Sequence, residues 1–317
     1  MGIGKQLWLA VMPALVTLAW PGAAAAQDIV KEAMADFPAG TVRLEYSSPA
    51  KLRTLPDYAT LSRRYVGPRL QQLEASLAQL GVQQDDIDEL VLGWQARGGG
   101  LDMTGLAQGR FDSRTVAQRA AAQGIAASPV GGTNAYCFGE SAAGNCIVFL
   151  ADNLGAFGTI ESLGAVLKAR GGEGSNAGTD SAFSRRVDAA KGDAPIWGVA
   201  VGAAIPDWFK GWLPSQNNLN LDWTQTFQTV EAVTYTVQPA DQVRLDVTID
   251  CTSSQAAGTL RQTMQGLKLI QQMAWQAQNP SVPNPFSSLQ VDVSDRQVRM
   301  NLTTAYAQLE AGALPKS

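Results

Sequence analysis

The sequence predicts an α+β protein in which antiparallel sheets carry helices on one face. The first observation is an alternation of period two: every second residue from 243 to 251 is apolar and the residues between are polar. This pattern is typical of a strand with one buried and one solvated face. The second is an apolar stripe at steps of three or four from residue 257 to 277, which indicates an amphipathic helix. The third is that the order strand, strand, helix, strand, strand occurs twice.

The C-terminal unit is the clearest. Alternation at residues 233–237 precedes that at 243–251, and Pro239-Ala240-Asp241 between them predicts a hairpin. Serine and threonine at 252–254 are candidate N-caps for the helix that follows, and Asn279-Pro280 ends it. The expected buried stripe of that helix consists of Ala257, Leu260, Met264, Leu267, Ile270, Ala274 and Ala277. Two further strands are expected, at residues 289–293 and 298–302.

The N-terminal half shows the same kinds of pattern. Val42, Leu44 and Tyr46 alternate and predict one face of a strand. Gly67-Pro68 separates two helical patterns, and Gly81 closes the second. The elements expected there are strands at residues 41–47, 90–96 and 101–111, helices at 58–65, 70–80 and 113–123, and hairpin arms at 133–138 and 146–151.

A tandem duplication of a β-α-β-β-α-β-β unit follows from this order, with residues 42–151 repeated as 156–303. In that alignment residues 156–160 match the strand near Val42, and residues 196–201 match 90–96. We therefore divide the chain into a signal peptide (1–26), a first α+β repeat (27–152) and a second (153–317). Whether the repeats share one core is left open.

The first residues resemble a secretory signal. Lys5 precedes an apolar run from Leu7 to Trp20, and Ala24-Ala25-Ala26 fits a cleavage site after Ala26. No cysteine follows that site, and no other apolar run is long enough to span a membrane. We expect an exported, soluble protein, periplasmic or extracellular, with no transmembrane helix in the mature chain.

Composition excludes several classes of function. The net charge is −4, which is opposite to the basic footprint that nucleic acid requires. The chain contains no histidine, so Ser-His-Asp and Cys-His catalysis and nearly all catalytic zinc sites are excluded. The Gly-x-Ser-x-Gly motif does not occur, and we expect no serine–lysine catalytic pair. No catalytic residue, cofactor or metal ligand is assigned.

The chain has three cysteines. Cys137 and Cys146 lie on either side of a short segment between strand-like runs, so we predict a disulfide that clamps a hairpin. Cys251 falls on the apolar face of its strand. We expect it to be a buried thiol rather than a nucleophile.

Acidic residues offer two weak candidates for chemistry. Asp85, Asp86, Asp88 and Glu89 could suggest calcium, but they lack the alternating ligands of an EF-hand, and a solvated turn is preferred. Asp102, Asp246 and Asp250 are the carboxylates available to an enzyme. The last two alternate with Arg244 on a polar strand face, where surface ion pairs explain them.

Two irregular stretches remain. Residues 171–178 are rich in glycine and are expected to form a flexible loop. Residues 205–214 contain four large apolar side chains at helical spacing within a turn bracketed by prolines. They could meet a ligand or partner, or they could plug the end of the core, which is the preferred alternative. The binding candidates are Trp208, Phe209, Trp212 and Leu213.

These observations favour an exported, non-enzymatic binding or interaction protein whose partner is an apolar ligand or an envelope protein. An envelope-associated structural module that works through protein contacts is the alternative, and a carboxylate-dependent enzyme is a weaker one. The absence of catalytic motifs separates the first two from the third. Oligomeric state and the binding of apolar dyes would separate the first two from each other.

Two short runs carry a resemblance. Gly109-Arg110-Phe111-Asp112 opens a helix, and Trp197-Gly198-Val199-Ala200 precedes the two-strand, long-helix, two-strand ending. Together with the export signal, these runs resemble a group of uncharacterised secreted bacterial α+β proteins. The resemblance covers most of the mature chain. It implies the compartment and the architecture and brings no activity with it.

Overall fold

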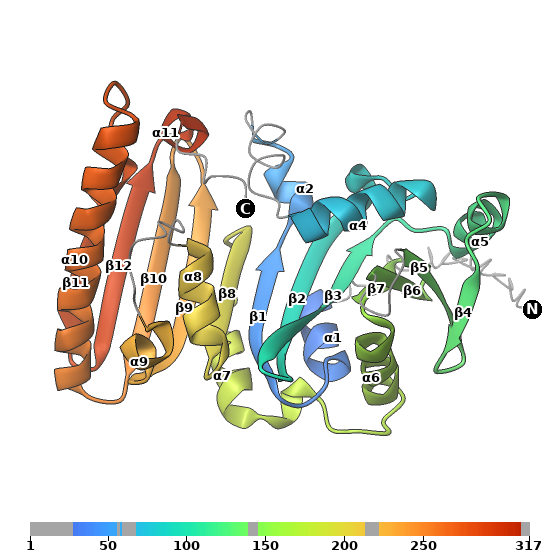
Figure 1. The fold of residues 1–317 in the computed structure, drawn as a ribbon. Helices are drawn as coiled ribbons and strands as arrows, with labels where there is room; N and C mark the ends of the chain where they lie inside the picture. Colours follow the sequence, from blue (N-terminus) through green and yellow to red (C-terminus); the bar gives the residue numbers. More distant parts are fainter. Residues whose placement is uncertain (1–27, 56–57, 59–67, 139–144, 213–221, 312–317) are drawn as a thin grey trace, which may run out of the picture.

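The computed structural model describes residues 28–55, 58, 68–138, 145–212 and 222–311 of the chain. Its main element is a 12-stranded sheet in the order β11-β12-β10-β9-β8-β1-β2-β3-β7-β6-β5-β4 (Figure 1). Neighbouring strands pair antiparallel throughout. The predicted α+β class with an antiparallel sheet is therefore confirmed.

The strands are β1 (Thr41–Ser47), β2 (Ile87–Arg97), β3 (Gly100–Gly109), β4 (Ala127–Val130), β5 (Thr133–Phe138), β6 (Asn145–Ala151), β7 (Leu154–Gly158), β8 (Ile196–Val201), β9 (Val230–Pro239), β10 (Val243–Cys251), β11 (Gln290–Ser294) and β12 (Gln297–Thr304). The helices are α1 (Ile29–Asp36), α2 (Pro49–Leu52), α4 (Pro68–Gln79), α5 (Ser113–Ala122), α6 (Ile160–Arg170), α7 (Ser181–Ala190), α8 (Ala204–Trp212), α9 (Trp223–Phe227), α10 (Ser254–Gln278) and α11 (Tyr306–Ala311). The helix predicted at 58–65 lies, except for Tyr58, outside the described residues, as does the predicted signal peptide.

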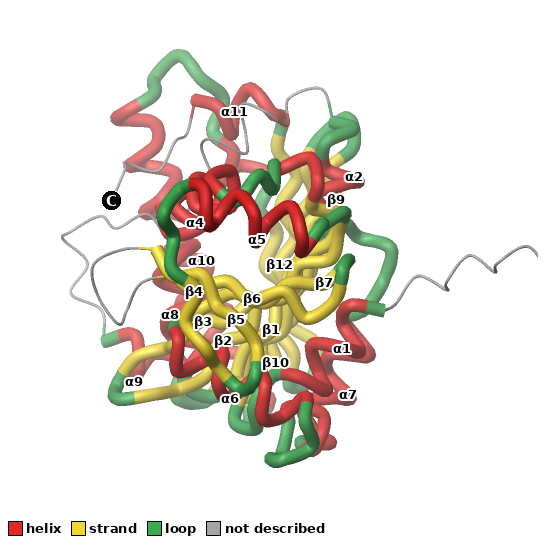
Figure 2. The backbone as a smooth tube through the Cα atoms, turned by 90° about the vertical axis from the view of Figure 1, so that its right-hand side faces the viewer, coloured by secondary structure: helices red, strands yellow, loops and turns green. Residues whose placement is uncertain are grey.

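Helices lie on both sides of the sheet (Figure 2). On the side that we call the α1 face, α1, α6 and α7 cover a core that includes Leu44, Leu106 and Trp197. On the opposite side, the α10 face, α8 and α10 cover β8–β12. Helices α4 and α5 cover β2, β3 and β7 on that same face. Alternate residues of one strand therefore pack into the cores on opposite faces of the sheet.

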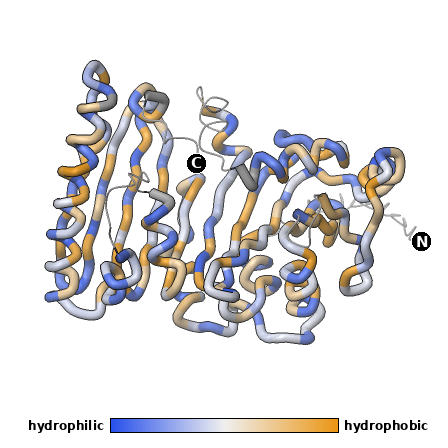
Figure 3. Tube along the Cα trace, in the orientation of Figure 1, coloured by the Kyte–Doolittle hydropathy of each residue, from blue (hydrophilic) through white to orange (hydrophobic). Residues whose placement is uncertain are grey.

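The expectation of helices on one face holds only for β10–β12, since α7 also contacts β9. There the second face is polar: β10 alternates between buried and half-buried residues, and the hydropathy of these strands alternates along their length (Figure 3). In the middle of the sheet the expectation is wrong. All four inner residues of β8 are buried because helices pack against both of its faces, as in strands whose sequence is apolar throughout.

The face predicted for β1 is correct at two of three positions. Leu44 and Tyr46 are buried in the α1-face core. Val42 instead packs against the α10-face core. The register with β2 shifts between Thr41 and Arg43, and a bulge of this kind sends the preceding side chain to the other side of the sheet.

The stripe predicted for α10 is correct in its first half. Ala257, Leu260, Met264 and Leu267 are buried, as expected. Ile270 and Ala274 are only half-buried and Ala277 is exposed. Gln271 and Trp275 are buried instead, at steps of four from Leu267, and residues 279–288 return alongside this part of the helix. The Trp275 indole donates to the Val282 carbonyl oxygen at 3.2 Å.

The centre of the sheet is the pairing of β1 with β8, in which Leu44 lies opposite Val199. From this pair the order continues β2, β3, β7 in one direction and β9, β10, β12 in the other. This order makes β1 and β8 the equivalent strands of a duplication, whereas residues 156–160 fall largely in β7. The duplication stays a prediction, and so does the division at 152/153, which falls in the turn between the paired strands β6 and β7.

The end of the loop at residues 171–178 pairs through its backbone with the segment that follows α1. Pro38 and Asn176 form an isolated antiparallel bridge. The Ala39 amide donates to the Ser175 carbonyl at 3.1 Å, and the Ala177 amide donates to the Phe37 carbonyl at 2.8 Å. Glycine content therefore predicted a loop correctly, and its flexibility stays a prediction. Among the described residues, no helix has the length and apolar character that crossing a membrane requires.

Replacing Val247 with aspartate should destabilise the fold severely. Its side chain is 2% exposed in the α10-face core, so the substitution places an unpaired charge in an apolar site and should cost more than about 3 kcal/mol. Thr248→Asp is the matched control, because Thr248 lies on the polar face between Thr234 and Arg299; it should cost less than about 1 kcal/mol. Urea denaturation measures both, and equal stabilities would mean that the strand phase is wrong.

A second pair of variants tests the close packing at β8. A Cβ atom at Gly198 would lie 2.6 Å from the ring of Tyr235, which is 2% exposed and cannot move aside. Gly198→Ala should therefore lower the free energy of unfolding by about 2 kcal/mol. Gly258→Ala in α10 is the matched control, because a Cβ atom there meets no heavy atom within 4 Å. This variant should raise the free energy of unfolding by up to about 1 kcal/mol. An unchanged free energy of unfolding in Gly198→Ala would contradict the close packing of Gly198 against Tyr235.

Candidate binding groove

The aromatic turn named from sequence is helix α8. Trp208 and Phe209 are each 2% exposed and belong to the α10-face core. The Phe209 ring stacks on Phe227 of α9 with a centroid separation of 3.9 Å, and the Trp208 ring lies 5.2 Å from Tyr235 of β9. The aromatic side chains thus join α8 and α9 to the sheet.

The buried positions of Trp208 and Phe209 agree with the core-plug alternative. Neither ring is presented at the surface for a ligand. The side chain of Trp212 and the whole of Leu213 lie outside the described residues. Binding by this turn stays a prediction, and the structure offers a different place to look for a site.

The hairpin clamp is confirmed. Cys137 of β5 and Cys146 of β6 are direct cross-strand partners and form a disulfide with a Cα–Cα distance of 4.0 Å. Cys146 is buried and Cys137 is half-buried. The bond fixes the end of a hairpin that forms one wall of a groove.

Helix α4 forms the opposite wall. Pro68 opens this helix at a position where its missing N–H costs nothing. Leu73, Leu77 and Leu80 turn inward to the core beneath β2 and β3, and Gly81 ends the segment at a φ of 81°. The polar side of α4 therefore faces away from the core and toward the hairpin.

Between α4 and the hairpin lies an open groove of about 600 Å³. That volume falls within the usual range for ligand sites. The groove is lined by Gln72, Ala75, Ser76, Gln79, Gly124, Ile125, Ala126, Ser128, Cys137 and Phe138. None of these described lining residues has an ionisable side chain, since Cys137 is in the disulfide. The lining alternates carboxamides and hydroxyls with small apolar groups and one aromatic ring.

Strand β5 extends further into the groove than its neighbour β4. The β4–β5 ladder ends at the pair Ala127 and Tyr136. The β5–β6 ladder continues for two more pairs, with Cys137 opposite Cys146 and Phe138 opposite Asn145. On the side away from β6, residues 137 and 138 of β5 therefore have no ladder partner in β4. Both residues line the groove.

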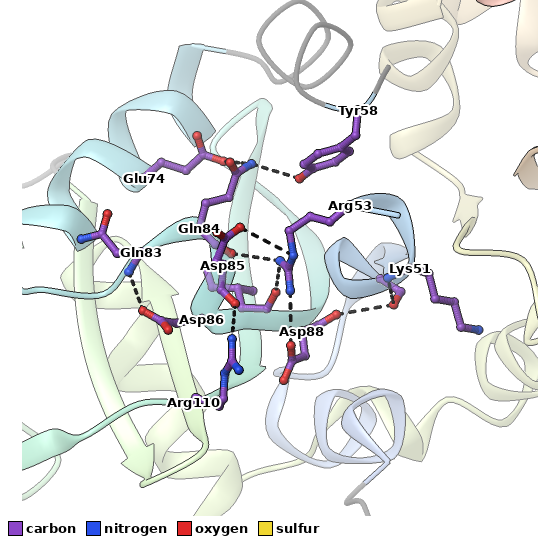
Figure 4. A network of polar contacts seen from close by, with 12 residues as sticks. Lys51, Arg53, Tyr58, Glu74, Gln83, Gln84, Asp85, Asp86, Asp88 and Arg110 are labelled. Carbon is purple, nitrogen blue, oxygen red and sulfur yellow. Dashed lines mark hydrogen bonds and ion pairs between the residues drawn. The ribbon is translucent and has the colours of Figure 1, made fainter. Parts of the chain in front are cut away.

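A network of polar contacts holds α4 in place from behind (Figure 4). The Gln84 side-chain amide lies 3.0 Å from the Tyr58 hydroxyl and 3.3 Å from the Glu74 carboxylate of α4. Burial raises the pKa of Glu74. Arg53 donates to the carbonyl oxygens of Gln84 and Ile87 at 3.1 and 2.7 Å. These contacts tie α4 and α2 to the start of β2, which fixes the groove wall.

The acidic turn belongs to the same network. Asp86 accepts from the Gln83 amide at 2.9 Å, Asp85 and Asp88 lie within ion-pair distance of Arg53, and Glu89 accepts from the Tyr46 hydroxyl. Within the described part of the chain, no group of three acidic or cysteine side chains could hold a metal ion. These side chains cap the turn or pair with arginine and tyrosine.

Two of the three carboxylates considered for catalysis, Asp246 and Asp250, have structural partners. Asp246 pairs with Arg244 and accepts from Asn301. Asp250 pairs with Arg186 of α7 and accepts from Gln297. These contacts account for both side chains as polar-face ion pairs.

One Ser-x-x-Lys spacing does occur, at Ser48 and Lys51, although no serine–lysine pair was expected. The Ser48 hydroxyl accepts from the Lys51 amide at 3.4 Å and caps α2. The Lys51 ammonium donates instead to the Asp193 carbonyl oxygen at 3.3 Å. Ser48 therefore caps a helix, and Lys51 makes a separate surface contact.

A charged cluster in the middle of the α10 face was missed. Arg43 pairs with Glu45, and its guanidinium lies 4.1 Å from the centre of the Trp94 ring. Burial, together with Glu45, raises the pKa of Tyr235 beside them. Because β1 alternates, the residues between its predicted core positions had to face the other side, but only the strand order shows that Trp94 and Tyr235 meet Arg43 there.

Sequence reasoning also missed the groove. Gln72, Ala75 and Gln79 form the polar side of a helix, a pattern that predicts a solvated surface. Ser128 lies in β4, a strand that the alternation did not predict. The one available signal was the disulfide, because it indicated that residues 137–138 lie at a fixed hairpin end.

Comparison with known proteins identifies a fold and no family. No protein-family model matches the chain, and no curated protein matches it. The solved structures that resemble it include crystal form I of TP0453, with 11% identity, a TM-score of 0.54, and coverage of 90% of this chain and 96% of TP0453. Crystal form III gives 10% identity, a TM-score of 0.53, and coverage of 88% and 96%. At this identity the likeness shows the shared α+β fold alone.

Thiol counting tests the cysteine assignments. The unfolded, unreduced protein should show one reactive thiol, and the reduced protein three. The native protein should show none over the same period, because Cys251 is 1% exposed and burial raises the pKa of its thiol, which lowers the reactive thiolate fraction. Three thiols before reduction would contradict the disulfide, and rapid native labelling would contradict the burial of Cys251.

Proposed function

We propose that this chain is an exported, non-enzymatic binding protein that holds its ligand in the groove between α4 and the ends of β4 and β5. The observation that carries the proposal is the built character of that groove. One wall is fixed by a disulfide and the other by the Arg53–Gln84–Glu74 network. Walls that are fixed before binding lower the entropy cost of association.

The chemistry of the chain supports binding over catalysis. There is no histidine, the groove lining has no ionisable group among the described residues, and Asp246 and Asp250 are committed to ion pairs. General acid–base and nucleophilic catalysis need a titratable or activated group at the reacting atom. Such a group is missing from the described walls of this groove.

Export rests on two independent features. The first 26 residues carry the pattern of a signal peptide with cleavage after Ala26. The Cys137–Cys146 bond is of the kind that persists in oxidising compartments such as the periplasm or the extracellular space. Of the two partner classes expected from sequence, the mixed polar lining favours an envelope protein over a purely apolar ligand.

A second candidate function is an envelope-associated module that works through a protein contact at the other end of the sheet. Among the described residues, Leu269, Met273 and Val293 are the exposed large apolar side chains, with 57%, 58% and 38% exposure. All three belong to α10 and β11, beside the open edge of the sheet. Leu269 and Met273 lie one turn apart on α10, and exposed apolar neighbours of this kind favour a contact surface.

Native mass spectrometry of the protein purified from its exported compartment tests the groove. We expect a bound species on the wild type that is lost in Ala75→Trp, since the indole would fill the groove. Ala78→Trp is the matched control: Ala78 is also an exposed alanine of α4 but does not line the groove. It should keep the bound species.

The outcomes separate cleanly. Loss of the bound species in Ala75→Trp, with its retention in Ala78→Trp, supports the proposed site. A bound species that survives Ala75→Trp places the ligand elsewhere and overturns it, and so does a wild type that is always ligand-free. A dimer mass that Leu269→Gln with Met273→Gln abolishes would transfer the function to the second candidate.

A further inference from the structure

We propose that the groove binds an extended, uncharged stretch of polypeptide through its main chain, by adding a short strand to the exposed end of β5. This inference rests on the proposed function, because it names the ligand class of the same groove. Three features carry it: a bare strand edge, two carboxamides above that edge, and the neutrality of the lining.

The bare edge is the two-residue extension of β5 beyond β4. Residues in a strand direct their N–H and C=O groups alternately to one neighbour and the other. One of Cys137 and Phe138 therefore points its N–H and C=O away from β6 and toward the groove. A ligand that runs antiparallel along this edge would take the place that β4 leaves vacant after Ala127. This is the main-chain pairing used in strand addition.

The carboxamides are those of Gln72 and Gln79 on α4. Neither side chain has a hydrogen-bond partner within the part of the chain that the structure describes. Seven residues of helix place them about 10 Å apart along the axis, which is the length of about three residues of extended chain. A carboxamide has one acceptor and two donor hydrogens, so it matches the donor and acceptor of a peptide group.

The lining also argues against other ligand classes. An anion would meet no cation among the described lining residues. An acyl chain would leave both carboxamides and the Ser128 hydroxyl facing hydrocarbon, which costs free energy unless a partner is supplied. The apolar groups of Ala75, Ile125 and Phe138 suit alternate side chains of a strand. An uncharged polypeptide satisfies both the polar and the apolar parts.

The test uses the mature, disulfide-bonded protein and a synthetic probe. The probe is the tightest-binding member of a library of N-acetylated, C-amidated heptapeptides built from Ala, Val, Thr, Ser and Gln. Single N-methyl derivatives of the probe are then compared by calorimetry. Methylation at the one residue whose N–H pairs with the β5 edge should weaken binding about tenfold by removing a main-chain hydrogen bond, and methylation at the residues on either side of it should change the affinity less than about twofold.

Protein variants provide the second readout. Gln72→Ala and Gln79→Ala should each weaken probe binding by about three- to tenfold. Gln118→Ala is the control, because Gln118 is exposed on α5 and does not line the groove. It should leave the affinity unchanged. Ala75→Trp should abolish binding.

An equal effect of N-methylation at every residue would overturn strand addition. A library with no member that binds below about 1 mM would overturn the polypeptide ligand. If, at the same time, the wild type keeps a native bound species that Ala75→Trp removes, the groove function stands and only the ligand class falls. A bound species identified by its mass as a lipid or a sugar would have the same consequence.

Discussion

The pairing of β1 with β8 is the constraint on which the rest of the structure depends. It joins strands that are about 150 residues apart in sequence and makes one sheet from both halves of the chain. Side chains lock it on the α1 face, where the Tyr46 and Trp197 rings stack with centroids 5.5 Å apart. On the α10 face Gly198 leaves room for the Tyr235 ring. Because the centre is packed on both faces, each outer half can expose one face or curl without exposing the core.

The two halves use that freedom differently. Strands β10–β12 are covered by α10 on one side and keep a polar surface with ion pairs on the other. At the opposite end the strands from β3 to β4 curl around α4 and α5 (Figure 2). The curl brings the end of β5 close to the polar side of α4, and the disulfide keeps it there. The groove is thus a consequence of curvature at one end of a long sheet and not of any single motif.

Local patterns predicted the local structure. The alternation at 243–251 predicted β10 and its buried face, and the cysteine spacing predicted the clamped hairpin, because both depend on neighbours in sequence. Features that depend on distant pairing could not be predicted. The bulge that moves Val42 to the other core is set by the register with β2. The groove residues Gln72 and Gln79 were missed because a helix face toward solvent and one toward a groove have the same sequence pattern.

The edges of the sheet show why main-chain recognition belongs at β5. An open sheet risks uncontrolled pairing at its ends, and proteins protect such edges with short strands, proline or charge. The outermost strand at this end, β4, has four residues, and one of them is Pro129, which has no N–H to continue a ladder. The unpaired part of β5 is recessed instead between α4 and the 124–126 segment. A peptide can reach that edge only by entering the groove, where Gln72, Gln79 and the neutral lining select it. Protection of the outer edge and access to the inner one are therefore two results of the same short strand.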